Sequence, residues 1–474
     1  MDDQADLVFI NASNPTHFWN QNVRRTVRRR AMRDIGKTRR KAKNPPAVTF
    51  AWQPVEPPVR CLDSYPRPWP GGIDSDPRAR ELIHFMHADA EYNYRPFRKV
   101  WFAMALTDQS AFILCKANAA MFLEKARLRN GDEFHYEHCA ETLSYYGQCV
   151  REVSSRLSDP VDCVSEGVFT TILGLICHDL YVGTLDRWAY HIRGLARIAS
   201  MRGGLGDLDA NLQLFACWFD VVGSVARDLP PRMPPTSMHL DSLAAYAMGK
   251  RTRGMRLDGI LDDIGNVQAP EDMDISCLVG VLGKIAALAE FINIHSSREP
   301  GFWKSEDDMR PLQLLGPVTH ELLSMPRADS STLGGFDAIR EMARLAMLIL
   351  LAWVKTKYGM SAPEMDYLQK KLSTLVSVSV NKQTVLPLPV LQLWCLVIAV
   401  LSDPSGASRR MYVQEISLRM ADINIQDGTS AVAAARDVIR IEDLASADAI
   451  SSLIFDIDMV YADENTDTTT SNPP

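Results

Sequence analysis

The chain has 474 residues, of which 46 % are hydrophobic and 23 % charged, and its formal net charge is -7. These values are typical of a soluble globular protein with one large core or two ordinary ones. The nine cysteines are odd in number, scattered and never spaced as C-x-x-C, which excludes a disulfide framework and a zinc knuckle and is typical of buried thiols in a reducing compartment.

The chain begins "MDDQADLVFI", where no basic region precedes an apolar run, so no secretory signal is predicted. The changes in composition along the chain predict four segments. They are a basic N-terminal arm over 1–43, a proline-rich linker over 44–77, a helical domain over 78–455 with a lobe break near 228–240, and a disordered acidic tail over 456–474.

The most pronounced local feature is "RRTVRRRAMRDIGKTRRKAK" at 24–43. It holds 11 lysines and arginines and one acid, and the rest of the chain has a net charge of about -17. Val27, Ala31 and Ile35 are spaced as on one helix face. The basic residues are Arg24, Arg25, Arg28, Arg29, Arg30, Arg33, Lys37, Arg39, Arg40, Lys41 and Lys43.

Several interpretations of this arm are open. A solvated charged helix explains it poorly, because the bases have almost no acidic partners to offset their repulsion. A nuclear import signal fits the separated clusters "RRTVRRR" and "KTRRKAK" and is favoured, while contact with nucleic-acid phosphates fits the charge density and is compatible with import. Docking on the acidic body also remains, and a membrane-surface helix fits less well because the arm has no bulky aromatic residue.

From residue 78 onward, apolar residues recur at helical spacing and predict an all-α fold. We expect Thr184 and Asp209 to be N-caps and Gly203 with Gly204 to form a left-handed C-cap. The expected helices cover 97–128, 168–182, 184–205, 209–226, 275–294, 310–325, 336–358, 362–378, 388–402, 405–422 and 430–454.

Two apolar runs, 343–354 and 385–401, are the candidates for membrane spans. Both are too short for a bilayer, and the second contains Pro387 and Pro389, so we expect two buried helices and no membrane association. Residues 376–385, "VSVSVNKQTV", are the one weak candidate for a strand.

The chain contains no phosphate-binding, dinucleotide-binding, serine-hydrolase or zinc-protease motif. The groups "HFMH" at 84–87 and "HYEHC" at 135–139 lack a ligand set with metal-site spacing, so we expect no metal and no cofactor. In "CHDL" at 177–180, thiol, imidazole and carboxylate do not share a helix face, so no catalytic triad is expected. The acidic pairs in 261–264 and 306–308 are isolated, which favours surface acids over an enzyme's metal motif.

Three stretches resemble proteins of the fungal-specific transcription factor domain family, over about residues 7–235. They are "LVFINASNP" with the basic arm, "VWFAMALTDQSAFILCKANAAMFL" at 100–123, and "WAYHIRGLARIASMRGGLGDL" at 188–208 with "WFDVVGSVARDLPPRM" at 218–233. The positions that carry the third likeness are Trp188, His191, Gly194, Arg202, Gly203, Gly204 and Asp220.

The opening resembles a branch of the family that lacks the zinc–cysteine binuclear cluster. That cluster needs six cysteines in a short segment, and the first two cysteines here are Cys61 and Cys115. The resemblance therefore implies a helical regulatory domain and a transcription role without the family's usual DNA-reading module.

The resemblance further implies a nuclear regulator of a metabolic gene cluster, with secondary metabolism as the narrower case. Its helical body would sense a small-molecule effector or bind other transcription proteins, and a homodimer is open. Nucleic acid would be contacted through the arm. Two alternatives remain, a nuclear scaffold protein that never contacts DNA and an all-α biosynthetic enzyme.

Overall fold

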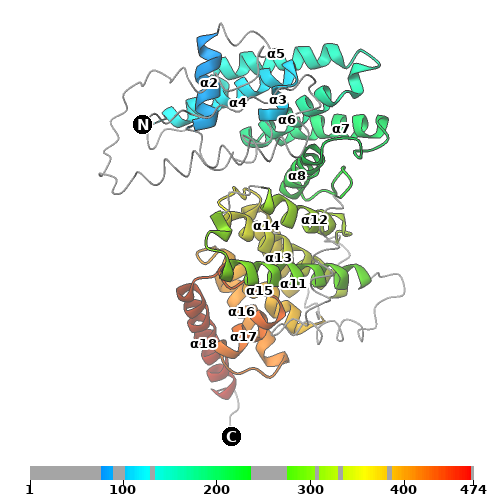
Figure 1. Ribbon diagram of the computed structural model, residues 1–474. Coiled ribbons are helices and arrows are strands. Elements are labelled where there is room, and N and C mark those ends of the chain that lie inside the picture. The colour runs from blue at the N-terminus through cyan, green and yellow to red at the C-terminus, as the bar shows by residue number, and fades with distance from the viewer. Residues whose placement is uncertain are drawn as a thin grey trace, which may run out of the picture. The chain divides into compact units, whose positions relative to one another are not determined.

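The computed structural model describes residues 76–88, 102–128, 134–235, 275–304, 309–328, 335–381 and 387–470. All of its regular elements in these ranges are helices, which confirms the all-α prediction (Figure 1). Contacts divide the chain into Met1–Pro58 and Val59–Pro474, and every described residue belongs to the second unit. The basic arm and nearly all of the predicted linker lie outside the described residues.

The helices follow one another along the described chain. The first group is α2 (Pro77–Ala88), α3 (Phe102–Ala105), α4 (Gln109–Arg127), η6 (Tyr136–His138), α5 (Ala140–Arg156), η7 (Asp162–Val164), α6 (Glu166–Val182), α7 (Leu185–Met201) and α8 (Ala210–Arg227). The second group is α11 (Ile275–Arg298), η8 (Phe302–Lys304), α12 (Arg310–Ser324), α13 (Gly335–Lys357), α14 (Met365–Asn381), α15 (Pro389–Ser402), α16 (Arg409–Asp422), α17 (Gly428–Val438) and α18 (Ala447–Thr470).

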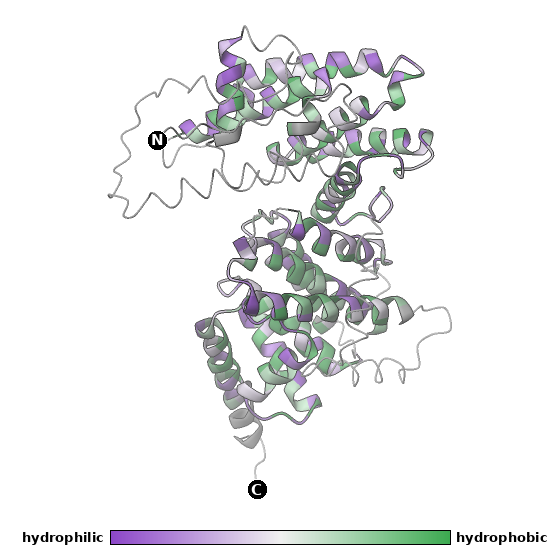
Figure 2. Ribbon diagram, in the orientation of Figure 1, coloured by the Kyte–Doolittle hydropathy of each residue, from purple (hydrophilic) through white to green (hydrophobic). Residues whose placement is uncertain are grey.

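Two helices of the core are apolar around most of their circumference because other helices surround them. α6 packs against α4, α7 and α8, and α15 packs against α13, α16 and α17. Many of the other helices carry a polar and an apolar side, as the hydropathy colouring shows (Figure 2). The run at 343–354 lies in α13 and most of the run at 385–401 in α15, and both helices are largely buried.

Helix α8 joins the two groups of helices. It packs against α6 on one side and α12 on the other, and buried residues of both groups belong to one continuous hydrophobic core. The lobe break near 228–240 stays a prediction.

Two of the three predicted caps are confirmed. The Asp209 side chain accepts a hydrogen bond from the backbone N–H of Asn211 at the start of α8. α7 ends in a left-handed turn in which Gly203 has a φ of 80° and the N–H of Gly204 donates to the carbonyl of Ala199 over 2.9 Å. Thr184 precedes α7 but does not cap it with its side chain, because its hydroxyl is directed to Asp179 instead.

The expected single helix over 97–128 is wrong, because the chain breaks at Asp108. The Asp108 carboxylate accepts the N–H groups of Ser110 and Ala111 and so starts α4, while α3 ends at Ala105. Arg156 of α5 fixes this carboxylate with a 2.7 Å ion pair. The cap itself is local, and a partner 48 residues away along the chain holds its carboxylate in place.

Three other expectations fail toward the C-terminus. The single helix expected over 430–454 is divided into α17 and α18 by a connection at 439–446. The strand candidate is helical as far as Asn381, where it ends α14, and α14 packs along α13. Regular structure does not stop at Phe455, because α18 continues to Thr470.

One described helix is long and apolar enough to span a bilayer, judged by length and composition. It is the Cys277–Arg298 part of α11, and half of its most apolar window is buried inside the protein. α11 packs against α12 and α13, which is the usual situation of a core helix in a folded protein.

Candidate functional site

The residues of the motif at 188–233 lie mainly at the junction of α7 and α8. The indole of Trp188 is buried, and its Nε1–H donates to the carbonyl of Phe219 over 3.0 Å. The ring lies directly on the backbone of Gly223, where a Cβ, if one were added, would stand 1.9 Å from the indole. Gly223 therefore permits the close approach of α7 and α8.

Asp220 holds the proline-marked loop after α8. Its buried carboxylate accepts the backbone N–H groups of Arg232 and Met233, the latter over 2.6 Å, and the hydroxyl of Ser224 over 3.3 Å. Burial raises the pKa of this carboxyl, and the two backbone hydrogen bonds oppose that rise. The geometry is that of a structural anchor.

The remaining motif residues have different surroundings. Arg202 donates to the carbonyl of Val164 and pairs with Asp207, so it ties the end of α7 to η7. Gly203 and Gly204 form the turn that ends α7. Gly194 is exposed, and a Cβ added there would have no atom within 4 Å.

His191 belongs to a polar cluster around Asp179, whose side chain is fully buried. Its Nδ1 lies 2.8 Å from one carboxylate oxygen of Asp179, and Nε of Arg187 lies 2.9 Å from the other. The guanidinium of Arg187 also covers the rings of Tyr136 and Tyr146, at 5.4 and 5.0 Å from their centroids. The cluster joins η6, α5, α6 and α7.

His178 lies next to Asp179 in sequence but has different partners. Its Nδ1 is 2.6 Å from Oδ1 of Asn118, and its Nε2 is 2.8 Å from the hydroxyl of Tyr136. We assign the imidazole proton to Nδ1, because it then donates to the asparagine carbonyl while Nε2 accepts from the tyrosine. Burial, followed by the positive charge of Arg187 and by His191, lowers the pKa of His178 to about 3.

The two tyrosines of the cluster do not supply a nucleophile. Burial raises the pKa of Tyr136 and, further, that of Tyr146, so both hydroxyls stay protonated at neutral pH. The hydrogen-bonded groups of the cluster are a carboxylate, two imidazoles, an amide, a guanidinium and phenols. This set is suited to holding five elements together, because the amide of Asn118 adds α4 to the four named above, and the contacts described above include no activated thiol or hydroxyl.

The pH dependence of stability should report on His178. In the unfolded chain a histidine takes up a proton near pH 6.5, whereas folded His178 stays neutral down to about pH 3. Its contribution to stability is therefore complete above pH 6.5 and is lost as the pH falls, at about 1.4 kcal/mol per pH unit. Urea unfolding between pH 6.5 and 5 should show this slope, and His178→Gln should reduce it. Equal slopes in the two proteins would contradict the assignment.

A second buried cluster lies where α8 ends, and the sequence patterns did not predict it. Asp228 ends α8 with a left-handed backbone (φ 49°), and both of its carboxylate oxygens lie 2.8 Å from guanidinium nitrogens of Arg344 in α13. Arg344 is fully buried and also binds Glu341, over 2.7 and 2.9 Å. Lys371 of α14 pairs with both acids, and Arg327 lies 3.4 Å from Asp228.

Charge pairing dominates this second cluster. Burial by itself would raise the pKa values of Asp228 and Glu341, but Arg344 and Lys371 outweigh it and hold both values below their ordinary ones. Three cations thus face two carboxylates, and the cluster connects α8 to α13 and α14. A signal for it existed in the sequence, since Arg344 stands inside the apolar run and Glu341 is three residues before it.

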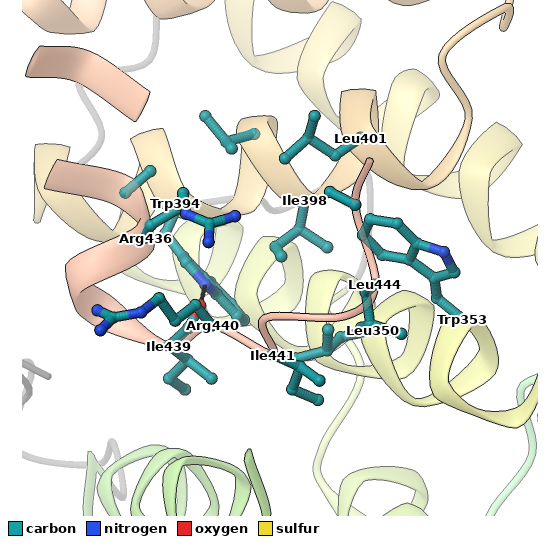
Figure 3. A pocket seen from close by; sticks show the side chains of 13 residues that line it. Leu350, Trp353, Trp394, Ile398, Leu401, Arg436, Ile439, Arg440, Ile441 and Leu444 are labelled. Carbon is teal, nitrogen blue, oxygen red and sulfur yellow. Dashed lines mark hydrogen bonds between the residues drawn. The ribbon is translucent and has the colours of Figure 1, made fainter. Parts of the chain in front are cut away.

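An apolar hollow lies between α13, α15, α17 and the connection that follows α17 (Figure 3). The hollow is partly open to solvent, and its cavity volume is about 20 Å³. Its apolar walls come from Leu350, Trp353, Trp394, Val397, Ile398, Leu401, Ala435, Ile439, Ile441, Leu444 and Ala445. The hollow is much narrower than a pocket for a drug-sized ligand.

Two arginines complete the lining at one end of the hollow. In Figure 3 Arg436 and Arg440 lie on the left and Trp353 on the right. The carboxylate of Glu442 bridges the two guanidinium groups, at 2.6 Å from Nη2 of Arg436 and 2.5 Å from Nε of Arg440. Arg440 also lies 3.6 Å from Asp437.

The histidine group at 135–139, considered as a metal site, has ordinary partners. His135 lies 3.4 Å from Glu137 and contacts the ring of His138, and the thiol of Cys139 donates to the His135 carbonyl. No group of three or more metal-binding side chains occurs within the described ranges. None of the eight cysteines in the described ranges forms a disulfide, and all but the half-buried Cys277 are buried.

The eleven basic residues from Arg24 to Lys43 lie outside the described residues, so their role stays a prediction. A comparison of the sequence with models of protein families gives a match over the helical part of the chain. A model of the fungal specific transcription factor domain matches residues 85–424, more than half of the chain and well beyond the motif at 188–233. Searches of curated proteins and of solved structures found no match.

Proposed function

We propose, because the chain belongs to the fungal specific transcription factor domain family, that this transcription regulator acts in the nucleus on a metabolic gene cluster. The observation that carries the proposal is the extent of the match, which covers the helical body from α2 through α16. Secondary metabolism is the narrower form of the proposal. Membership of this family is consistent with a protein that is not an enzyme.

The basic arm supports a role at DNA or in nuclear import. Its 11 lysines and arginines supply the charge that either activity needs. The cysteine spacing within these 474 residues does not match the six-cysteine pattern of a zinc binuclear cluster, and we propose that DNA contact is made by phosphate binding or through partners. The scaffold alternative differs only in having no DNA contact.

The outer side of α18 supports binding to other transcription proteins. Phe455 and Met459 are one helical turn apart and are 64 % and 51 % exposed. They stand in a segment, residues 441–474, that has eight acids and no lysine or arginine. Exposed apolar side chains in an acidic helix fit a partner surface that is apolar with a basic rim.

Neutralising the arm tests the proposal in the full-length chain. We expect that replacing all eleven bases with glutamine reduces nuclear accumulation and, where the protein binds DNA fragments, removes most of the salt dependence of binding. The measurements are microscopy of a tagged protein and binding to mixed genomic fragments across a salt series.

A matched control neutralises three exposed cations of the body, Arg193, Arg197 and Lys370, and should leave both properties unchanged. If the arm variant accumulates in the nucleus normally, the arm is not the import signal. If the unchanged protein binds no DNA at low salt, the scaffold alternative is favoured. Activation or repression of a reporter by the chain fused to an unrelated DNA-binding domain tests the regulatory role itself.

A further inference from the structure

We propose that the hollow beside α17 binds a small apolar carboxylate, with its hydrocarbon part against the tryptophans and its carboxylate between Arg436 and Arg440. The bound carboxylate would take the position that the Glu442 side chain holds in the structure. As an effector site this rests on the proposed regulatory function, whereas binding itself is a property of the purified protein.

The walls of the hollow indicate that one part of the ligand is a hydrocarbon chain. Apart from the two arginines, every side chain in the lining is aliphatic or an indole. The indole N–H of Trp394 is already occupied, because it donates to the carbonyl of Ile439 over 2.9 Å. The hollow therefore offers apolar contact and few hydrogen bonds, and its small volume favours a short hydrocarbon chain over a bulky ligand.

The two arginines indicate that the other part of the ligand is a carboxylate. A guanidinium binds a carboxylate with charge-assisted hydrogen bonds, and two of them on one carboxylate form a strong clamp. Arg436 and Arg440 form such a clamp around Glu442, and both arginines also line the hollow. A ligand with an acid group at the end of an apolar chain would satisfy both features together.

Glu442 is suited to being displaced. Its side chain is 49 % exposed, so the carboxylate enters water at little cost when it leaves the clamp. Its backbone does not need to move, because its N–H donates to Oδ1 of Asn293 over 2.8 Å. The same asparagine donates to the carbonyl of Arg440 over 2.9 Å. The connection thus stays in place while one side chain exchanges with the ligand.

The experiment uses the purified full-length chain and two probes that differ only in charge, hexanoate and hexanamide. Calorimetric titration should show that hexanoate binds about tenfold more tightly than hexanamide. Arg436→Gln should remove this preference. Glu442→Gln should increase hexanoate affinity about tenfold, because it removes the competing carboxylate, and should leave hexanamide unaffected.

The pair of Arg419 and Asp422 supplies matched controls. The two residues form an ion pair at 3.0 Å on α16, and their exposed fractions of 23 % and 48 % are close to those of Arg436 and Glu442, 22 % and 49 %. Neither residue lines the hollow, so Arg419→Gln and Asp422→Asn should leave hexanoate binding unchanged.

Three results would overturn the site. They are equal binding of the two probes, no binding of hexanoate at millimolar concentration, or an unchanged affinity in folded Glu442→Gln protein. If a variant does not fold, the site is still tested by comparing hexanoate and hexanamide binding to the unchanged chain. If hexanoate binds as expected but a reporter shows no transcriptional activity, the site stands and the proposed function fails.

Discussion

Arg344→Met should lower the free energy of unfolding by about 3–5 kcal/mol, because it leaves the buried carboxylates of Asp228 and Glu341 without their main partner. Methionine keeps much of the volume, so the loss reports on charge and not on a cavity. Lys371 remains near both acids and should keep the loss toward the lower end of that range. Urea unfolding at pH 7 measures the change.

A double variant separates the loss of charge pairing at Arg344 from the other effects of replacing this side chain. Removing Glu341 as well, in Arg344→Met with Glu341→Gln, takes away one stranded charge and should recover part of the lost stability. A matched control is Arg340→Met, four residues earlier on α13, where the arginine pairs with the partly exposed Asp337. The Arg340 side chain is 11 % exposed and Asp337 is 33 % exposed, so that control should cost less than Arg344→Met, because the acid it leaves behind is still reached by water. A loss below about 1 kcal/mol for Arg344→Met would contradict the dry environment that the structure gives this cluster.

Gly223→Ala should destabilise the protein by about 3 kcal/mol or more, although it adds one methyl group. The new Cβ would lie 1.9 Å from Cε2 of Trp188 and 2.4 Å from its Nε1, so the indole has to leave its place. The buried ring would lose both its packing and its hydrogen bond to the Phe219 carbonyl. Thermal and urea unfolding, together with tryptophan emission, measure the effect.

Gly194→Ala is the control for this prediction. Gly194 lies on α7 and is exposed, and the Cβ of an alanine there would have no atom within 4 Å. Alanine favours a helix interior more than glycine, so Gly194→Ala should stabilise the protein by up to about 1 kcal/mol. A second test combines Gly223→Ala with Trp188→Leu, which makes room for the methyl group. If Gly223→Ala alone costs less than the Trp188→Leu change, the close approach of α7 and α8 is not needed for stability.

The helices were predictable because their pattern is local. α7 and α8 begin and end close to their expected limits, since Asp209 and Gly203 act within a few residues of their own position. The break at Asp108 has a local signal of the same kind, an N-cap aspartate, which the continuous apolar spacing of 97–128 concealed, whereas the connection at 439–446 is held by a distant residue. Arg156 fixes Asp108 from 48 residues away, and Asn293 holds Arg440 from 147 residues away.

Among the polar residues, too, the sequence showed which residues matter but not which distant residues they contact. The sequence marked His191 as a residue of the family motif, but it did not reveal that Asp179, twelve residues earlier, is its hydrogen-bond partner. His178 and Asp179 are neighbours in sequence, yet one faces Asn118 and Tyr136 while the other faces His191 and Arg187. Adjacent helix positions point about 100° apart, so they enter different environments.

The sequence by itself determined that this chain is helical, where several helices begin and end, which family it belongs to, and that one dense cluster of bases stands near its start. Helix periodicity and capping depend on residues three or four positions apart, so they can be read from one stretch of chain. The tertiary structure alone decided that Arg344 pairs with Asp228 across 116 residues and that two arginines close one end of an apolar hollow. Buried charges and cavities exist only where distant helices meet, because it is their packing that excludes water and brings the partners together.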